Sequence, residues 1–555
     1  MGDSVSINID GRSLSVPAGI NVIEAAELAG VEIPHFCYHP NLKVAGSCRM
    51  CLVSVGTPAR DRATGAPVLN DDGTPKIAFM PKLAIACGTR VSEGMHIVTD
   101  SEQVRSAREG VIEFILANHP LDCPICDKAG ECRLQEYSAK YGSGVCRYVE
   151  DKNVKPKRVE IGGGRVVLDA ERCILCSRCI RICREVVGRD ILQFTKRGSK
   201  NEIAVYGDDG RDSNYLLNIV DSCPVGALTE TAFRFRMRTW FLRPTDGISA
   251  ESSAGVNTRV WSREGEVYRI TPRANPEVND AWMTDSGRSE YRFMNCDSRF
   301  TAMRVDGAPC DAHYAVARAA EIFGMGGGLA IVASGRQTLE EQFMTSELAR
   351  ISGARVYAAA HLGEDDGFLL SCDRTPNMRG LFISGLISEY PGRDLGALSR
   401  DIRDGSVKSV ISFGEDLIAL GLEERDFKLA NIIYCGSRDN PTARLAKVAV
   451  ACPSVFEKSG LFVNRQFRLQ KFEKAVEAPE GVEDEIAVLT RLINALGTSS
   501  YSVPEIGEVR KVMAAACPIL PEGCAVGRGG VLLDPSKFSG IDFPEANALH
   551  FDKNE

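Results

Sequence analysis

Cys173, Cys176 and Cys179 are spaced as C-x2-C-x2-C, and Cys223 follows later in the chain, directly before Pro224. Three thiolates in such a tight turn can bind three corners of an iron–sulfur cubane, and a later Cys-Pro supplies the fourth ligand. A second cysteine triplet would be needed if Cys223 served another cluster, and the sequence has none near it. These four cysteines therefore predict one [4Fe–4S] cluster.

Cys183 is an alternative fourth ligand, because it stands at a C-x3-C interval from Cys179. It is followed by Arg184 instead of proline, so we expect it to be a buried thiol beside the cluster. The arginines of this segment either offset the charge of an anionic cluster or form a solvated basic face. They are Arg172, Arg178, Arg181 and Arg184.

A second set consists of His119, Cys123, Cys126 and Cys132. The histidine stands four positions before a C-x2-C pair, and one further cysteine follows at a ligand-like interval, which predicts a [4Fe–4S] cluster with one imidazole ligand. A neutral imidazole in place of a thiolate lowers the negative charge of the cluster and raises its potential. Cys146 is the rival fourth ligand, but it lies fourteen residues beyond Cys132.

The first set in chain order predicts a [2Fe–2S] cluster, and its residues are Cys37, Cys48, Cys51 and Cys87. The plant-type spacing is C-x4-C-x2-C with a distant fourth cysteine, whereas here the first gap is ten residues. Cys87 is the expected fourth ligand because no other cysteine lies between positions 51 and 123. His35 and His39 could suggest a Rieske centre, but that centre needs two Cys-His motifs and only one is present.

The elements that must position the first set begin with a period-two strand at 5–9, a turn at Asp10-Gly11 and a second strand up to Val16. A helix is expected over 21–28, capped by Asn21. Strand, hairpin, helix and a cysteine-bearing loop are the opening of a β-grasp ferredoxin domain. Residues 67–75 predict a hairpin insertion with an Asp-Gly turn, and residues 104–117 predict an amphipathic helix before the second set.

In the C-terminal half, short apolar runs alternate with helical patterns, which predicts parallel α/β layers. Strands are expected at 329–332, 354–357, 410–413 and 432–434, with a helix over 339–351. The glycine run at 324–328 is not G-x-G-x-x-G and precedes a strand instead of following one, so it predicts a helix stop and turn and not a nucleotide site. Gly162 to Gly164 likewise predict a turn.

Bulk composition narrows the functional class. The chain has 555 residues, 25% of them charged, and a net charge of −8, so neither nucleic acid nor an anionic membrane surface is an expected partner. No apolar run reaches the ~18–20 residues that span a bilayer, and the first residues do not form a signal peptide. Twenty cysteines, mostly at cluster spacings, favour a reducing cytoplasm over a disulfide scaffold. Structural zinc is disfavoured because zinc sites use paired C-x2-C knuckles.

The three motifs in this order resemble the large iron–sulfur subunit (75 kDa type) of respiratory complex I, the NADH:quinone oxidoreductase. The resemblance rests on residues 33–40, 48–51, 119–136 and 223–229, and continues at 265–270. It implies that the chain takes electrons from a flavoprotein subunit that oxidises NADH. The electrons would pass through the [2Fe–2S] and all-cysteine [4Fe–4S] clusters, then through the histidine-ligated cluster towards quinone-side subunits. Membrane contact would occur only through the complex.

Some bacterial members of that family carry a fourth, off-path cluster. The corresponding stretch here, 249–257, has serine or valine at the cysteine positions, and Cys296 alone remains as a relic. One cysteine cannot hold a cubane, so we expect this cluster to be absent. The C-terminal region resembles the molybdopterin-oxidoreductase fold that the complex I subunit carries without its cofactor, with residues 457–464 in support.

The resulting prediction is a multidomain α/β and α+β protein without a complete active site of its own. Its regions are a β-grasp [2Fe–2S] domain (1–99), a histidine-ligated [4Fe–4S] module (100–146), a ferredoxin-like [4Fe–4S] domain (147–232) and a molybdopterin-oxidoreductase-like domain without cofactor (233–555). The alternative is the iron–sulfur subunit of an NAD-linked formate dehydrogenase or hydrogenase complex. A molybdenum enzyme would need a metal ligand, for which Cys372 is the least implausible candidate.

Overall fold

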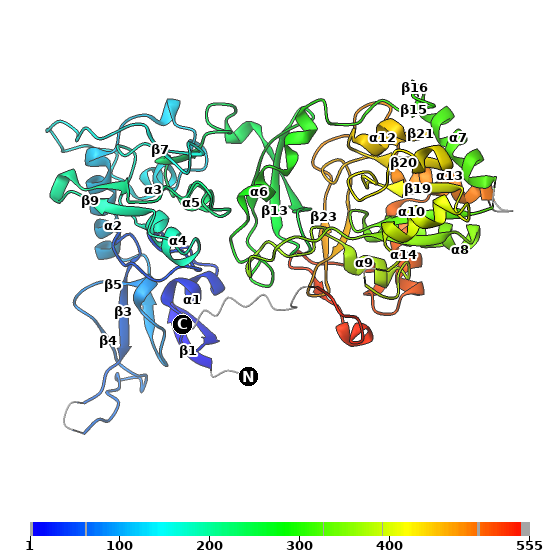
Figure 1. The fold of residues 1–555 in the computed structure, drawn as a ribbon. Coiled ribbons are helices and arrows are strands. Elements are labelled where there is room, and N and C mark those ends of the chain that lie inside the picture. Colours follow the sequence, from blue (N-terminus) through cyan, green and yellow to red (C-terminus); the bar gives the residue numbers. More distant parts are fainter. Residues whose placement is uncertain (1–3, 62–63, 326, 391, 497–499, 545–555) are drawn as a thin grey trace. The chain divides into compact units, whose positions relative to one another are not determined.

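The structure, a computed structural model, describes residues 4–61, 64–325, 327–390, 392–496 and 500–544. The chain divides into two compact units, Met1–Trp240 and Phe241–Glu555, which run from blue to teal and from green to red in Figure 1. The interpretation of the N-terminus as lacking a signal peptide falls partly on residues 1–3, which lie outside the described residues. Within the described ranges, no helix has the length and apolar character to cross a bilayer.

Unit 1 begins with a mixed sheet in the order β2-β1-β6-β3-β4, and β5 also pairs with β3. Strands β1 and β2 form the predicted hairpin, while β1 and β6 run parallel. The bounds are β1 Ser4–Ile9, β2 Arg12–Pro17, α1 Val22–Leu28, β3 Leu52–Pro58, β4 Ile77–Phe79, β5 Ala84–Ile85 and β6 His96–Val98. The predicted strands, turn and helix are therefore confirmed.

Helix α1 starts where the sequence places its cap. The Asn21 side chain accepts hydrogen bonds from the Ile23 and Glu24 amides, and the Glu24 carboxylate accepts from the Asn21 amide, which makes a capping box. The side-chain amide of Asn21 also donates to the Tyr38 hydroxyl at 3.2 Å. The cap thus joins the helix to the loop that contains the first cysteine.

The insertion between Cys51 and Cys87 is less regular than a two-stranded hairpin. Isolated bridges join Arg60 to Pro67 and Leu69 to Pro75, and the Asn70 amide donates to the Thr74 carbonyl across the Asp-Gly turn. The turn prediction is confirmed. Regular strand pairing resumes only at β4, which lies antiparallel to β3.

The rest of unit 1 consists of helices and short sheets around the second and third ligand sets. Strands β9 and β10 form a two-stranded sheet, and β11-β8-β7 form a three-stranded one. The turn at Gly162 to Gly164 joins β7 to β8, as predicted. The bounds are α2 Glu102–Asn118, α3 Arg133–Tyr141, β7 Val159–Ile161, β8 Val166–Leu168, α4 Arg178–Glu185, β9 Leu192–Thr195, β10 Glu202–Val205, α5 Asn218–Ser222 and β11 Leu228–Glu230.

Unit 2 is built on a seven-stranded sheet in the order β16-β15-β21-β20-β19-β17-β18. Strands β17 to β21 are parallel, which confirms the predicted α/β layers. Helix α7 ends at Gly324 and β17 begins at Leu329, as expected for a helix stop and turn, although residue 326 lies outside the described residues. Smaller sheets β12-β13-β14 and β22-β23-β24 complete the unit (Figure 1).

The bounds in unit 2 are β12 Arg243–Ile248, β13 Asn257–Arg263, β14 Glu266–Pro272, α6 Asp285–Arg288, β15 Arg304–Val305, β16 Ala308–Pro309, α7 Ala312–Gly324, β17 Leu329–Ser334, α8 Leu339–Ser352, β18 Arg355–Ala359, α9 Met378–Ile383, α10 Leu395–Arg403, β19 Ser409–Phe413, α11 Asp426–Leu429, β20 Asn431–Gly436, α12 Pro441–Leu445, β21 Val448–Ala451, β22 Gly460–Val463, β23 Arg468–Phe472, α13 Glu485–Leu496, α14 Ile506–Ala516 and β24 Val531–Leu532. Apolar side chains of β17, β19, β20 and β21 form the main core with those of α7, α10 and α13. Strands buried in this way read as continuous apolar runs, which is why they can be recognised in the sequence.

Replacing Asn21 by alanine removes the cap of α1 and its bond to Tyr38. We expect the Asn21→Ala variant to lose about 1 kcal/mol of unfolding free energy, measured by denaturant unfolding of the full chain. Asn21→Asp keeps an acceptor at the cap and should lie within a few tenths of a kcal/mol of the parent. Equal stability of the alanine variant and the parent would contradict the role of the cap.

Candidate iron–sulfur centres

The structure gathers the first ligand set, Cys37, Cys48, Cys51 and Cys87, in one buried region of the β-grasp domain. The Cys37 amide donates to the Cys48 sulfur at 3.5 Å, and the Cys51 and Cys87 sulfurs lie 3.5 Å apart. The two pairs also interact electrostatically, because a negative charge on Cys37 disfavours ionisation of both Cys51 and Cys87.

Strand pairing explains how Cys51 meets Cys87 across the long insertion. Leu52, the first residue of β3, pairs with Ile85 at the end of β5, and the Ala86 amide donates to the Cys51 carbonyl at 3.0 Å. The two ends of the insertion therefore lie side by side at β3, which brings Cys51 next to Cys87.

Four thiols packed this closely cannot all ionise without a compensating cation. The hydrogen bond with Cys48 lowers the pKa of Cys37 to about 5, while the same contact raises the pKa of Cys48 far above its ordinary value. Cys51 and Cys87 behave in the same way, with the pKa of Cys51 lowered and that of Cys87 raised by their mutual hydrogen bond. One thiolate per pair is thus stabilised, and bound iron is the kind of cation that stabilises the second.

The Rieske alternative does not fit the surroundings of His35. Its Nδ1 lies 2.9 Å from the Ile33 carbonyl, and its Nε2 lies 3.0 Å from a guanidinium nitrogen of Arg133. Both ring nitrogens are therefore occupied by protein groups. His39 Nδ1 accepts from the Asn41 amide at 3.2 Å.

The third set, Cys173, Cys176, Cys179 and Cys223, lines a single small cavity. Burial raises the pKa of Cys173 to about 12 and that of Cys176 to about 11, and it raises that of Cys179 well above its usual value. Cys183 also lies on α4 and is fully buried, but it is not among the residues that line the cavity. The donor set and its burial suit a cubane, whose positive irons would stabilise the thiolates.

The second set is gathered less tightly. Cys123 begins a single 3-10 turn that ends at Ile125, and the Cys126 amide donates to the Cys123 carbonyl at 3.3 Å. Burial raises the pKa of both Cys126 and Cys132, and the charge of Cys126 raises that of Cys132 further. Cys123 is exposed, as is the rival Cys146.

His119 follows the last residue of α2 and is neutral at pH 7. Burial, aided by the positive charge of Arg172, lowers its pKa to about 4. A neutral imidazole is the form that binds metal. Its electrostatic neighbours include Asp122, which directly precedes Cys123. A cavity of about 490 Å³ is lined by both His119 and Cys173, so the second and third sets are neighbours.

Two arginines of α4 connect the third set to the first. Arg178 donates to the Tyr38 and Ser222 carbonyls, while Arg181 donates to the Cys37 and Lys43 carbonyls. At the end of the same helix, Glu185 accepts from the Lys43 amide at 2.9 Å. Helix α4 therefore fixes the loop of the first set through three of its side chains, Arg178, Arg181 and Glu185. Of the four arginines that the sequence singles out, Arg172, Arg178 and Arg181 contact the ligand loops. Arg184 instead pairs with Asp190, where both side chains are half exposed.

Arg172 and Arg133 connect the second set to its neighbours. Arg172 precedes Cys173 and binds Asp122, which precedes Cys123, at 2.9 Å. The Arg133 side chain contacts His35, and its amide donates to the carbonyl of Pro224 at 3.2 Å. All three ligand loops are thus held to one another by arginine contacts.

Gly226 lies at a close approach between the segments of the third and second sets. A Cβ atom added to this residue would stand only 2.1 Å from the Cys126 sulfur. The glycine lies three residues after Cys223, so the segment that closes the third set packs directly on a thiol of the second. Sequence reasoning missed both this contact and that between Arg133 and His35, because neither has a local spacing signal.

Among the described residues, no group of three His, Cys, Asp or Glu side chains is arranged for a single metal ion.

Four family models match this chain in sequence order. Residues 2–102 match a 2Fe–2S iron–sulfur cluster binding domain, and residues 108–145 match the NADH-ubiquinone oxidoreductase-G iron–sulfur binding region. Residues 163–229 match the ferredoxin-like domain of NADH-quinone oxidoreductase subunit 3, and residues 242–292 match a NDSU1/NuoG-like 4Fe–4S domain of NADH-ubiquinone oxidoreductase. The predicted N-terminal [2Fe–2S] domain and the [4Fe–4S] modules after it are confirmed at this level.

Relatives with curated names give the same result. The chain is 42% identical over 284 residues to the NADH-ubiquinone oxidoreductase 78 kDa subunit of Candida albicans, which covers 51% of this chain and 36% of the relative. It is 41% identical over 288 residues to the G-type subunit of NADH-quinone oxidoreductase from Rickettsia felis, with 52% and 39% covered. It is also 41% identical to NADH dehydrogenase [ubiquinone] iron-sulfur protein 1 of Solanum tuberosum, with 52% and 36% covered.

These alignments span less than two fifths of the relatives' own length and about half of this chain. The resemblance to the large iron–sulfur subunit of complex I is thus confirmed for the N-terminal half. Among solved structures, a chain of an NAD+-reducing [NiFe]-hydrogenase aligns with 26% identity and a TM-score of 0.33, covering 43% of this chain and 92% of that one. A TM-score this low carries no argument about the fold or the function of this chain.

Replacing Gly226 by alanine should disturb the second ligand set specifically, because the new methyl group would overlap the Cys126 sulfur. We expect Gly226→Ala to lose iron from that site while the other two sites keep theirs, measured by iron content and EPR of the reduced full chain. Gly110→Ala is the matched control, since it lies in α2 with nothing within 4 Å of the added atom. Unchanged iron in Gly226→Ala would contradict the packing described.

Proposed function

We propose that this chain is an electron-transfer subunit of an NADH:quinone oxidoreductase, of the large iron–sulfur type found in respiratory complex I. The observation that carries the proposal is the convergence of three cluster-type ligand sets in a region about 41% identical to such subunits. The partners proposed are a flavoprotein subunit that oxidises NADH and other subunits of the peripheral arm. Contact with the membrane, on its cytoplasmic face, would be made only through the complex.

The proposed clusters are one [2Fe–2S] and two [4Fe–4S] centres, and they supply one-electron redox sites when bound. Their ligands are Cys37, Cys48, Cys51 and Cys87 for the binuclear centre, then His119, Cys123, Cys126 and Cys132, then Cys173, Cys176, Cys179 and Cys223. Support comes from the mutual contacts and burial of the cysteines. The domain boundaries at 99, 146 and 232 are proposed with them.

The chain's own contribution is to hold the ligand loops at fixed separations, with most of their cysteines buried. Arg178 and Arg181 fix the first loop against the helix of the third set, and Gly226 brings the third against the second. This adjacency supports an electron path from the binuclear site through the all-cysteine site to the histidine-ligated one. No side chain is proposed to act as acid, base or nucleophile.

The fourth, off-path cluster is proposed to be absent, although residues 242–292 match a 4Fe–4S family model. The residues at its expected cysteine positions instead join a hydrogen-bond network of unit 2. Ser249 donates to the Glu290 carboxyl group at 2.9 Å, and the Ser252 hydroxyl accepts from the Ser371 amide at 3.4 Å. Hydroxyl groups engaged in this way are poor substitutes for thiolates. The C-terminal region is proposed to have a molybdopterin-oxidoreductase-like fold without the cofactor.

Replacing Cys176 by serine in the assembled complex tests the proposed function. We expect NADH:quinone reductase activity to be lost while NADH oxidation with a soluble artificial acceptor persists, because the flavoprotein would still be reduced. Cys183→Ser, at the neighbouring thiol that we exclude as a ligand, should keep both activities. Full quinone reduction by the Cys176→Ser complex would refute the relay.

Replacing His119 by cysteine should keep the second cluster and lower its potential, because a thiolate adds negative charge to it. The measurement is an EPR-monitored redox titration of the reduced complex. Cys146→Ser, at the rival ligand, should leave the potential unchanged. A titration curve that moves for Cys146→Ser and not for His119→Cys would assign the fourth ligand to Cys146.

A further inference from the structure

A cavity of about 500 Å³ in unit 2 opens at the carboxyl ends of the parallel strands. Its walls include residues that directly follow three neighbouring strands: Arg336 after β17, Glu415 after β19 and Arg438 after β20. The chain continues from β17 to β18 on one side and returns to β19 on the other, so the strand order reverses here. Open α/β sheets bind their ligands at such a reversal.

Two arginines bring positive charge to this cavity without tight ion pairs. Arg438 stacks on the Phe293 ring at 3.9 Å and makes no ion pair within the described part of the chain. Arg336 reaches only Glu415, at 4.0 Å. Burial, together with the positive charge of Arg336, lowers the pKa of Arg438. Two neighbouring arginines with so little compensation favour an anion between them.

The acidic residues of the cavity wall are already engaged. Glu415 binds His361 at 2.6 Å and also accepts from the Ser334 hydroxyl. Asp416 accepts from the Thr442 hydroxyl at 2.8 Å. Glu290 accepts from Ser249 and from the Ala250 amide, and burial raises its pKa to about 8, so it is protonated at neutral pH. These carboxyl groups therefore repel an incoming anion less than their number suggests.

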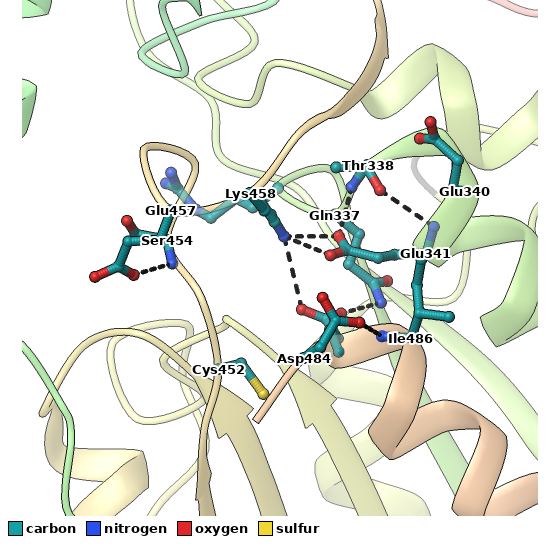
Figure 2. A network of polar contacts seen from close by, with 12 residues as sticks. Gln337, Thr338, Glu340, Glu341, Cys452, Ser454, Glu457, Lys458, Asp484 and Ile486 are labelled. Carbon is teal, nitrogen blue, oxygen red and sulfur yellow. Dashed lines mark hydrogen bonds and ion pairs between the residues drawn. The ribbon is translucent and has the colours of Figure 1, made fainter. Parts of the chain in front are cut away.

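Lys458 is likewise occupied. Its ammonium nitrogen lies 2.7 Å from both Glu341 oxygens and 3.8 Å from Glu485, and Figure 2 shows it directed toward Glu341. Burial, with the charge of Glu341, raises the pKa of Glu485 to about 8. Lys458 therefore serves as the centre of an internal network, which leaves Arg336 and Arg438 as the cations available to a ligand.

Two buried oxygens of the cavity wall lack hydrogen-bond partners. Gln337 is 2% exposed; its amide nitrogen donates to Thr345 and Glu485, while its Oε1 has no partner in the described structure. Ser454 is 4% exposed and its amide is bound by Glu457, but its hydroxyl has no partner among these residues. A buried polar atom left unpaired costs about 1–3 kcal/mol. A ligand whose hydroxyl or amino groups hydrogen-bond to these two oxygens would remove that cost.

The remaining wall suits a ligand with a flat apolar part. Phe293, Phe413 and Phe456 line the cavity. The volume is that of a typical small-molecule site.

We propose that this cavity binds a small phosphate-bearing ligand of nucleotide size, with the phosphate at Arg336 and Arg438 and hydroxyl or amino groups at Gln337 and Ser454. This binding site does not depend on the proposed electron-transfer function. It adds a ligand site to a region for which the relay assigns no redox centre.

The test is calorimetry of the full chain with AMP, adenosine and inorganic phosphate as separate probes. AMP should bind, and adenosine, which lacks the phosphate, should bind at least about tenfold more weakly. If inorganic phosphate binds as tightly as AMP, the anion site stands and free phosphate is its source. Absence of heat from both phosphate-bearing probes, at millimolar concentration, would overturn the proposal.

Variants distinguish this cavity from other surfaces. Arg438→Gln should weaken AMP binding by about tenfold or more, and Ser454→Ala should weaken it less. Arg425→Ala is the matched control, because this exposed arginine pairs with Glu423 outside the cavity wall. Equal weakening by Arg425→Ala would place the binding elsewhere. EPR signals of the clusters should be the same in all three variants, so failure here is separate from failure of the relay.

Discussion

The mutual repulsion of buried thiolates is the constraint on which the N-terminal half depends. Cysteine sulfurs 3.5 Å apart can share one negative charge through a hydrogen bond, but full ionisation of the set needs a compensating cation inside the protein. The same holds for the buried third set, where the pKa of Cys173 is raised to about 12. Bound iron would meet that need, and cluster binding would then be coupled to folding of these loops.

Fixed spacing between the sites follows from contacts that lie outside the ligand motifs. Helix α4 carries Cys179 and also, through Arg178 and Arg181, holds the backbone carbonyls of the first loop. Arg172 ties the third loop to the second through Asp122. Since arginine is always charged and forms several hydrogen bonds in a planar fork, it suits this joining role better than lysine.

The sequence predicts the local elements well, and the structure brings together the cysteines that it groups into the first and third sets. The hairpin, the capped helix after Asn21, helix α2 and the parallel strands of unit 2 all have local periodicity or a capping residue. The contact of Gly226 with Cys126 and that of Arg133 with His35 join residues far apart in the chain, and no spacing rule encodes them. The cavity of unit 2 could not be predicted from the sequence either, because its wall combines single residues from the ends of separate strands.

The number and kind of clusters per chain is the central claim, and it is tested most directly by iron and acid-labile sulfide analysis of the purified protein with EPR of its reduced form. The account predicts about ten iron and about ten sulfide, with one binuclear and two tetranuclear signals. About fourteen of each would show that a fourth cubane is present after all. Zinc in place of iron, or no sulfide, would contradict the relay.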